Sequence, residues 1–179
     1  MPGSDLQAQL TLSFEDAVRG VTKSVRINSE ALDAPMEVNV RIPPGVSDGQ
    51  RIRVAGRGAR SRDGGEPGDL LVTISIQPHD RFERDGLNLL VDLPVTFGEA
   101  ALGAKVKIPT LSGSSVTVKL PAGTQSGRTF RVRGRGVEAS SGTGDLLAKV
   151  SIHVPEQLSD RERELIEELA SISEAAPRG

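Results

Sequence analysis

Cysteine and most aromatic residues are absent from this 179-residue chain, which contains no Cys, no Trp, no Tyr and four Phe. Without cysteine, a disulfide framework, a thiolate zinc site and a cysteine nucleophile are all excluded. The absence of disulfides is compatible with a reducing cytoplasm, and we expect a cytoplasmic protein. Because aromatic side chains are so few, the core must consist of Val, Leu and Ile, of which Val and Ile favour β-strands.

The chain also lacks a dominant charge and a long apolar segment. It carries 22 basic and 24 acidic residues and a formal net charge of −2, so no overall field attracts nucleic acid or an anionic membrane. No segment approaches the roughly 18 consecutive apolar residues of a membrane helix. The first residues, Met1 to Asp5, have neither the charged nor the apolar region of a signal peptide. We therefore expect no membrane association.

Residues suited to acid–base or nucleophilic catalysis are equally scarce. His79 and His153 are the only histidines, and a catalytic set requires a base, an orienting partner and a nucleophile. His79 precedes Asp80, but neighbouring residues in a linker rarely orient one another. We therefore expect no enzyme activity, no catalytic residue, no metal site and no cofactor.

What the chain does contain is an internal duplication. The matched segments are LTLSFEDAVRG (10–20) with LPVTFGEAALG (93–103), IPPGVSDGQRIRVAGRG (42–58) with LPAGTQSGRTFRVRGRG (120–136), and GDLLVTISI (68–76) with GDLLAKVSI (144–152). The second pair is identical at eight of 17 positions and the third at six of nine. Since order and spacing are kept, the chain consists of two copies of one unit.

The duplication predicts two domains in tandem. The first spans residues 5–78 and the second residues 79–155, and domains of about this size can fold alone. The joint between them falls in the polar stretch 78–86, which ends in the turn signal Asp85-Gly86. A C-terminal helix over residues 156–174 follows the second domain.

Hydrophobic and polar residues alternate within each copy, as in residues 36–42, 70–76 and 116–120. A period of two predicts strands with one buried face. Pro and Gly between these segments predict turns, and the Gly-Arg-Gly sequences at 56–58 and 134–136 place two glycines where the backbone needs a positive φ. The residues alone therefore predict an all-β fold, either a sandwich or a barrel.

Three segments have the pattern of helix starts. Ser13–Asp16 and Thr96–Glu99 have the spacing of capping boxes and precede short helical turns. Ser159–Glu162 is a third capping box, and it begins the one long helix. The apolar residues of that helix lie on a single face, which makes it amphipathic. They are Leu165, Ile166, Leu169 and Ile172.

Arginines are concentrated on strands and loops of both copies. They are Arg51, Arg53, Arg57, Arg60 and Arg62 in the first copy and Arg128, Arg131, Arg133 and Arg135 in the second. A basic groove of this kind could follow a phosphate backbone. Binders of single-stranded nucleic acid normally add aromatic stacking platforms, and only Phe130 lies in this stripe. We favour arginines that face solvent and do not expect nucleic acid as a partner, but a nucleic-acid-binding β module is the alternative function.

A further apolar face lies on residues 21–27. Val21, Val25 and Ile27 share this face with Lys23, its only polar member. A β domain with an open sheet edge can pair with an extended peptide, while shallow pockets accept the apolar side chains of that peptide. The alternation itself leaves two interpretations open, a core face and a peptide-binding groove.

Several long motifs occur in a family-specific order over about residues 5–172. They are IPPGVSDGQRIRVAGRG, GDLLVTISI, PHDRFERDG, LPVTFGEAALG, LPAGTQSGRTFRVRGRG and PEQLSDRERELIEELA. On these motifs the chain resembles the C-terminal substrate-binding region of DnaJ-type co-chaperones. The resemblance implies an all-β fold of two tandem, duplicated β-sandwich domains, each with one short helical turn, and a C-terminal amphipathic helix that joins two protomers.

The resemblance also implies what the chain binds. In similar proteins the first domain holds a segment of a non-native client polypeptide in an apolar groove. Here this implies client-binding roles for Lys23, Val25 and Ile27, with Val72 and Ile74 across from them. In some members the same domain also binds the acidic tail of a partner chaperone, which would suit Lys23 and Arg26. The implied partners are unfolded polypeptides and a DnaK-type chaperone.

A second copy of the chain is the remaining implied partner. The homodimer would form through Leu165, Ile166, Leu169 and Ile172 of the C-terminal helix. The alternative for this helix is that the same residues cover the second domain of their own chain.

Two departures from the family pattern matter. The J domain with its His-Pro-Asp motif is absent, and Pro78-His79-Asp80 has a different order, so this chain alone should not stimulate a DnaK-type ATPase. One subclass inserts a cysteine-rich zinc region where residues 28–35 of this chain contain no cysteine. The chain either resembles the zinc-free subclass or lacks that insertion. The predicted function is a co-chaperone module that holds extended apolar client segments and presents them to a DnaK-type chaperone.

Overall fold

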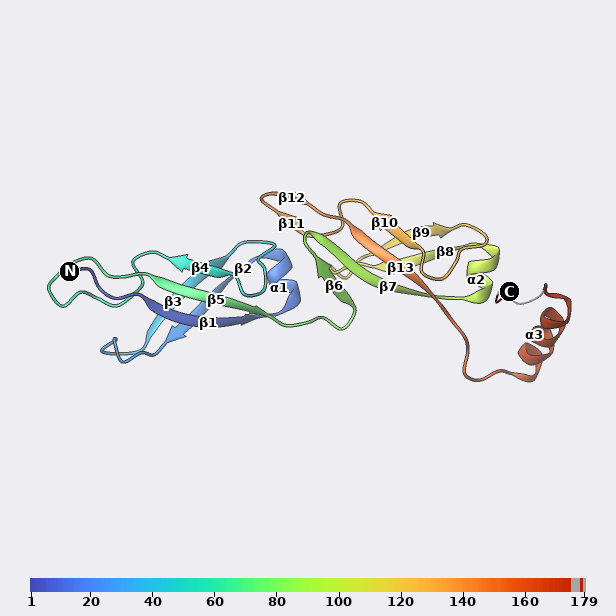
Figure 1. Ribbon diagram of the computed structural model, residues 1–179, viewed down its shortest axis with the longest axis horizontal. Coiled ribbons are helices and arrows are strands. Elements are labelled where there is room, and N and C mark those ends of the chain that lie inside the picture. The colour runs from blue at the N-terminus through green and yellow to red at the C-terminus, as the bar shows by residue number, and fades with distance from the viewer. Residues whose placement is uncertain (175–177, 179) are drawn as a thin grey trace.

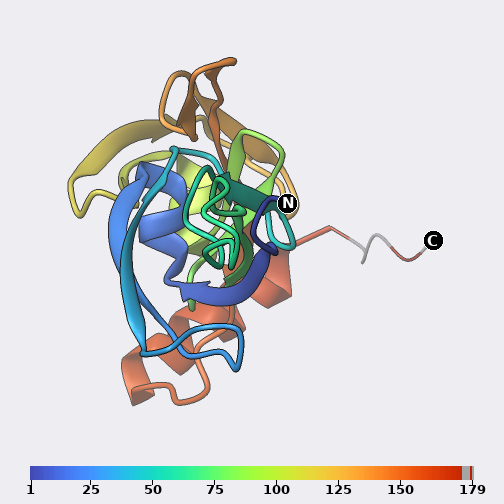
Figure 2. The same cartoon turned by 90° about the vertical axis from the view of Figure 1, so that its left-hand side faces the viewer.

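The structure is a computed structural model that describes residues 1–174 and 178. Two β units lie in line along the long axis of the molecule, and a helix follows the second unit (Figure 1). The view along this axis shows the first unit in front of the second (Figure 2). The first unit contains β1 (Leu6–Leu12), α1 (Phe14–Arg19), β2 (Val21–Ile27), β3 (Met36–Ile42), β4 (Arg51–Val54) and β5 (Leu70–Ile76). The second contains β6 (Phe82–Asp85), β7 (Asn88–Thr96), α2 (Phe97–Leu102), β8 (Ala104–Pro109), β9 (Ser115–Leu120), β10 (Thr129–Val132), β11 (Glu138–Ala139), β12 (Gly142–Thr143) and β13 (Leu146–His153). The helix at the end is α3 (Asp160–Ile172).

Each unit is a sandwich of a larger sheet and a two-stranded sheet. In the first unit the larger sheet has the order β1-β5-β4, and β2 pairs with β3 in the smaller one. In the second unit the larger sheet has the order β10-β13-β7-β6, and β8 pairs with β9. In both units the strand that precedes the short helix runs parallel to the last long strand, as β1 does to β5 and β7 to β13. The predicted fold class, two tandem duplicated β-sandwiches with short helical turns and a C-terminal helix, is confirmed.

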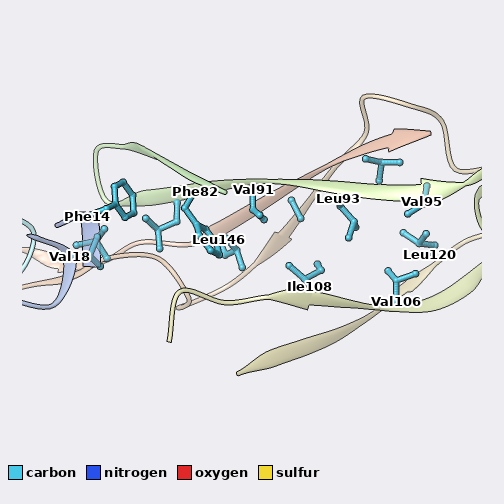
Figure 3. Close-up of a cluster of buried hydrophobic side chains, with 14 of the residues drawn as sticks. Phe14, Val18, Phe82, Val91, Leu93, Val95, Val106, Ile108, Leu120 and Leu146 are labelled. Atoms are coloured by element: carbon cyan, nitrogen blue, oxygen red, sulfur yellow. The ribbon is translucent and has the colours of Figure 1, made fainter. Parts of the chain in front are cut away.

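The cores consist of aliphatic side chains, as the scarcity of aromatics predicts. The core of the first unit contains fully buried residues from β3 and β5, among them Val40, Leu70 and Val72. The core of the second unit runs along β7, β8 and β13, and Figure 3 shows it with Leu93, Ile108 and Leu146 between the sheets. The alternating segments of the sequence therefore supply the inner faces of both sandwiches.

The polar stretch 78–86 differs from the linker that its composition predicts. It contains β6, which pairs antiparallel with the start of β7 and adds an edge strand that the first unit does not have. Phe82 of β6 is only 4% exposed and lies in the core of the second unit. The charged residues of this stretch predict a linker, but strand pairing and the buried Phe82 hold it against the sheet.

A hydrogen-bonded lock recurs in the two copies and explains the repeated Gly-Arg-Gly and Gly-Asp-Leu-Leu sequences. Asp69 accepts a hydrogen bond from the Gly56 N–H at 2.9 Å and pairs with Arg53 at 3.4 Å. In the second copy Asp145 accepts one from the Gly134 N–H at 2.9 Å and pairs with Arg131 at 2.6 Å. Each lock joins the loop after the short strand to the start of the last strand.

The two glycines of each Gly-Arg-Gly sequence serve different purposes. Gly56 and Gly134 have positive φ angles of 69° and 73°, as predicted. Gly58 and Gly136 do not; a Cβ on either would lie 2.5 Å from a backbone carbonyl carbon of the opposite segment. The second glycine is therefore required by the close approach of two chain segments and not by its φ angle, which corrects the prediction.

The helix starts agree with the sequence in two of three places. Thr96 with Glu99 and Ser159 with Glu162 form reciprocal capping boxes. Ser13 also caps α1 by accepting from the Asp16 N–H, but the Asp16 carboxylate does not complete a box. It contacts Lys23 of β2 at 3.4 Å instead, so this short side chain ties the helix to the following strand.

We predict that the second lock makes the stability of the protein depend on pH. The hydrogen bond from Gly134 and the contact with Arg131 lower the pKa of Asp145 in the folded protein. Its contribution is therefore present above the unfolded pKa of about 4 and is lost as the pH falls through the lower folded pKa. Asp145→Asn should lower the Tm at pH 7, and the difference from the wild type should shrink in acid. Calorimetry from pH 7 to pH 2 measures both, with exposed Asp33→Asn as the control, and a difference that stays constant over this range would contradict the lock.

Candidate functional site

The strand β2 has an unpaired edge. It pairs with β3 along its whole length, from Val21 opposite Ile42 to Ile27 opposite Met36, and no strand among the described residues pairs with its other edge. The backbone N–H and C=O groups of alternate residues therefore face outward without a partner strand. This is the geometry that an added peptide strand requires.

Four of the five residues expected to bind a client lie in one core. Val25 and Ile27 of β2 are 7% and 4% exposed, and Val72 and Ile74 of β5 are 0% and 1% exposed. All four belong to the same hydrophobic cluster of the first unit. Lys23 lies on the same face of β2, but its side chain is 43% exposed and contacts Asp16. The structure thus brings the predicted residues together, while it places the aliphatic ones beneath the surface.

Half-buried aliphatic side chains surround this core and form the accessible apolar surface of the first unit. They are Ala8 and Leu10 of β1, Val21 of β2, Leu32, Met36 of β3, Ile52 and Val54 of β4, and Ile76 of β5. We call this set the aliphatic rim. Val21 is the rim residue on β2 itself, at the end of the strand that follows α1. The alternating pattern predicts the face on which Val21 lies, but it does not distinguish the ends of a strand, which stay accessible, from the buried centre.

The apolar stripe of α3 is exposed. Leu165, Ile166 and Leu169 are 43–46% exposed, Ile172 is 80% exposed, and α3 has no buried residue. A second apolar patch lies on the second unit, where Phe97 and Leu102 of α2 and the nearby Val154 are 59%, 83% and 83% exposed. Large exposed apolar side chains that gather at one end of a protein mark an interaction surface.

Two arginines of the basic stripe are already paired within the chain. Arg53 and Arg131 contact Asp69 and Asp145 in the two locks. Arg128 lies with its guanidinium 4.8 Å from the ring centroid of Phe130, the one aromatic residue of the stripe. These contacts give the arginines structural roles and occupy the only stacking platform that the stripe offers.

Two tandem β-sandwiches with an unpaired edge strand and an exposed apolar helix define a class of duplicated β module. Within this class, the family model described as the DnaJ C terminal domain matches residues 6–155. The match covers most of the chain, and the chain therefore belongs to the DnaJ C-terminal domain family.

Curated relatives support the same assignment. The chain is 55% identical over 143 residues to chaperone protein DnaJ 2 of Cutibacterium acnes, which covers 79% of this chain and 38% of that protein. It is 52% identical over 131 residues to chaperone protein DnaJ 1 of Streptomyces coelicolor, covering 73% of this chain and 33% of that protein. The chain therefore spans about a third of the length of these relatives.

A third relative indicates residues that this chain lacks. Chaperone protein DnaJ 1 of Streptomyces avermitilis is 53% identical over 229 residues, covering 92% of this chain and 58% of that protein. The aligned region is longer than the 179 residues of this chain, so the relative has internal residues with no counterpart here. This agrees with the expectation that the chain resembles the zinc-free subclass or lacks an insertion.

Within residues 1–174, no helix is both long and apolar enough to cross a bilayer.

We predict that Ile27 contributes to stability as a core residue. Ile27→Ala should lower the free energy of unfolding by about 2–5 kcal/mol, because it leaves a cavity in a packed core. Arg26 is its exposed neighbour, and the control variant Arg26→Ala should change this free energy by less than about 0.5 kcal/mol. Urea denaturation of the two variants measures the difference. A loss for Ile27→Ala as small as that for Arg26→Ala would contradict the burial and would mean that Ile27 lines an open groove.

Proposed function

We propose that this chain is the client-binding module of a cytoplasmic co-chaperone, and that it holds an extended apolar segment of an unfolded polypeptide against the open edge of β2. The observation that carries the proposal is the unpaired edge of β2, a strand that also contributes Val21 to the aliphatic rim. Family membership supports it, because the relatives are chaperone proteins of the DnaJ type. In this proposal Lys23, Val25, Ile27, Val72 and Ile74 form the floor and side of the client site.

The chemistry of the site suits partners of many sequences. Backbone hydrogen bonds to β2 are independent of the client sequence, whereas the aliphatic rim favours segments with exposed hydrophobic side chains. The buried side chains support this site without being exposed in it, because their packing determines the shape of the surface that a client side chain contacts. They are those of Val25, Ile27, Val72 and Ile74. Because a disordered client loses conformational entropy when it binds, we expect weak affinity for a single site.

A DnaK-type chaperone is the proposed recipient of the client. Lys23 and Arg26 place two positive charges on β2. These charges are complementary to an acidic segment of that partner, which would bind to them. The 179 residues contain no His-Pro-Asp sequence, so stimulation of the partner's ATPase is not part of the proposal for this chain.

Dimerisation would give the module two client sites. We propose that the stripe of Leu165, Ile166, Leu169 and Ile172 on α3 joins two copies, and that the α2 patch of Phe97 and Leu102 is part of the same interface. Both surfaces are exposed within one chain and lie at the same end of the molecule (Figure 1). Two weak sites on one dimer raise the avidity for a long client without any new contact. No observation favours the nucleic-acid-binding alternative, because Arg53, Arg128 and Arg131 make contacts within the chain, and Arg128 packs against Phe130, the one aromatic residue of the stripe.

We predict that the client site can be weakened by one charge at its rim. Val21→Asp places a carboxylate among the rim residues of β2 and should weaken the binding of an extended apolar peptide at least about tenfold, which corresponds to about 1.4 kcal/mol. Thr22→Asp adds the same charge one residue along, on the opposite and exposed face of the strand, and should change the Kd by less than about twofold. Titration calorimetry gives both values, and circular dichroism checks the fold. Equal binding by the two variants would place the client elsewhere.

We predict that a charge on the α3 stripe separates the dimer. Leu169→Asp should halve the mass measured by sedimentation equilibrium, because an unpaired carboxylate would be buried in the interface. Glu167→Gln, on the same helix but outside the stripe, should leave the dimer intact. Removal of residues 156–179 should have the same effect as Leu169→Asp, and a mass that this truncation does not change would rule out α3 as the dimer contact.

A further inference from the structure

The helix α1 belongs to the cores of both units. Ala17 is buried in the core of the first unit. Phe14 and Val18, one helical turn apart on another face, are buried in the core of the second unit. Figure 3 shows Phe14 and Val18 at the end of that core, beside Phe82. A six-residue helix is thus shared between two sandwiches.

The duplicate helix shows that this packing is particular to the junction. Phe97 of α2 occupies the repeat position of Phe14, yet it is 59% exposed, whereas Phe14 is 8% exposed. Val18 is replaced in the repeat by the exposed Ala101. The sandwich therefore folds without burying this phenylalanine, and the burial of Phe14 comes from contact between the units.

His79 connects α1 to the start of the second unit. Its Nδ1 accepts hydrogen bonds from the Arg81 and Phe82 N–H groups at 3.0 and 3.2 Å. Since Nδ1 accepts, the ring proton lies on Nε2, which is 2.9 Å from Glu15 Oε1 and donates to it. The ring also packs against Phe14 and Phe82, with centroid separations of 5.6 and 5.2 Å. The orienting partner of His79 is thus Glu15 on α1 and not the adjacent Asp80.

Arg84 of β6 makes a second connection. Its guanidinium donates hydrogen bonds to the carbonyl oxygens of Gly45 and Val46 in the first unit, and its Nε donates to the Gly86 carbonyl at 2.8 Å. Partial burial lowers the pKa of Arg84, but an arginine with a lowered pKa is still charged near neutral pH. One cation therefore binds carbonyl groups of both units.

Gly45 brings the same turn against the second unit. A Cβ at this position would lie 3.1 Å from side-chain atoms of both Val137 and Ala139. A further contact forms on another side of α1, where Arg19 donates to the Leu111 carbonyl at 3.1 Å. The contacts of residues 79–84, of the 43–50 turn and of Leu111 come from three separate parts of the chain, so together they restrict rotation of one unit against the other.

The strand β2 begins directly after α1, the helix that these contacts hold against the second unit. Gly20 joins α1 to β2 with a φ of 76°, and a Cβ there would lie 2.8 Å from Pro44. The contact of Asp16 with Lys23 adds a tie between helix and strand. The direction of β2 is thus fixed by α1, and α1 is held by the second unit.

We propose that Phe14, His79 and Arg84 are positioning residues that set the orientation of the client strand β2 relative to the second unit. The term client strand depends on the proposed function, whereas the fixed junction does not. Each subunit of the proposed dimer, which we call an arm, would then be one rigid body. It would present its open edge in a defined direction to a client bound by both arms.

The junction can be tested by distance measurements between the units. The chain contains no cysteine, so Asn39→Cys on β3 and Thr117→Cys on β9 give two unique, exposed sites for spin labels. Labelled chains diluted with unlabelled protein should give one narrow distance distribution by pulsed electron resonance. His79→Ala, Glu15→Ala and Arg84→Ala should broaden it, while Glu15→Gln, which keeps an acceptor for Nε2–H, should leave it narrow. The 15N shifts of the His79 ring should report the Nε2–H tautomer in the wild type.

Repeat positions provide matched controls for this test. Gly45 and Gly123 have similar φ angles of 81° and 76°, but only Gly45 faces another segment within 4 Å. Gly45→Ala and Gly123→Ala therefore introduce similar backbone strain, and only Gly45→Ala should broaden the distribution. In the same way Phe14→Ala should broaden it, whereas Phe97→Ala should not. Circular dichroism confirms that each variant is folded.

Client binding is then measured separately. A short apolar peptide should bind His79→Ala within about twofold of the wild type, because it occupies a single site. Suppression of aggregation of a long unfolded client, which uses both arms, should fall. Distributions that stay narrow in His79→Ala and Arg84→Ala would overturn the positioning role. If the wild type fails to bind the peptide while the distributions broaden as predicted, the proposed function fails and the fixed junction stands.

Discussion

The unpaired edge of β2 is the feature on which the proposed mechanism depends. A sheet of two strands leaves a row of backbone donors and acceptors on each outer edge, and those groups must bind water or another strand. The outward-facing side chains of β2, Thr22, Ser24 and Arg26, are all polar. They discourage indiscriminate pairing of exposed edges, while the aliphatic rim on the other face favours hydrophobic segments. A site of this kind binds extended, apolar and unfolded chains more readily than folded proteins.

The duplication supplies two copies of the same sandwich, which then make different use of the same helix. In the first copy, Phe14 and Val18 are buried against the second unit, and the helix becomes the joint between the two. In the second copy, Phe97 and Leu102 remain exposed beside the exposed α3. The proposed client edge, the joint between the units and the proposed dimer surface thus follow one another along the molecule, which is elongated in Figure 1. Family membership is shown by the match to the DnaJ C terminal domain, and client transfer is our proposal.

Local patterns in the sequence predicted most of the fold. Alternation predicted the inner faces of β3, β5 and β9, and the Ser159–Glu162 spacing predicted the start of α3. The repeated motifs predicted two equivalent sandwiches. What they did not predict depends on contacts between distant residues. A half-buried Val21 and a buried Ile27 have the same place in an alternating pattern, and nothing near His79 indicates that its partner is Glu15. Phe14 and Phe97 occupy the same position in the repeat, and the sequence around them does not show that the first is buried against the other unit while the second is exposed.

Hydrogen exchange of the backbone amides with and without a bound apolar peptide tests the central proposal most directly. In an edge strand, alternate residues turn their N–H groups outward, and an added strand protects those groups. Addition of the peptide should therefore slow exchange at every second amide of residues 21–27, while the amides that already bond to β3 change little. Saturating peptide that leaves all amides of β2 exchanging as before would show that the client does not pair with this edge.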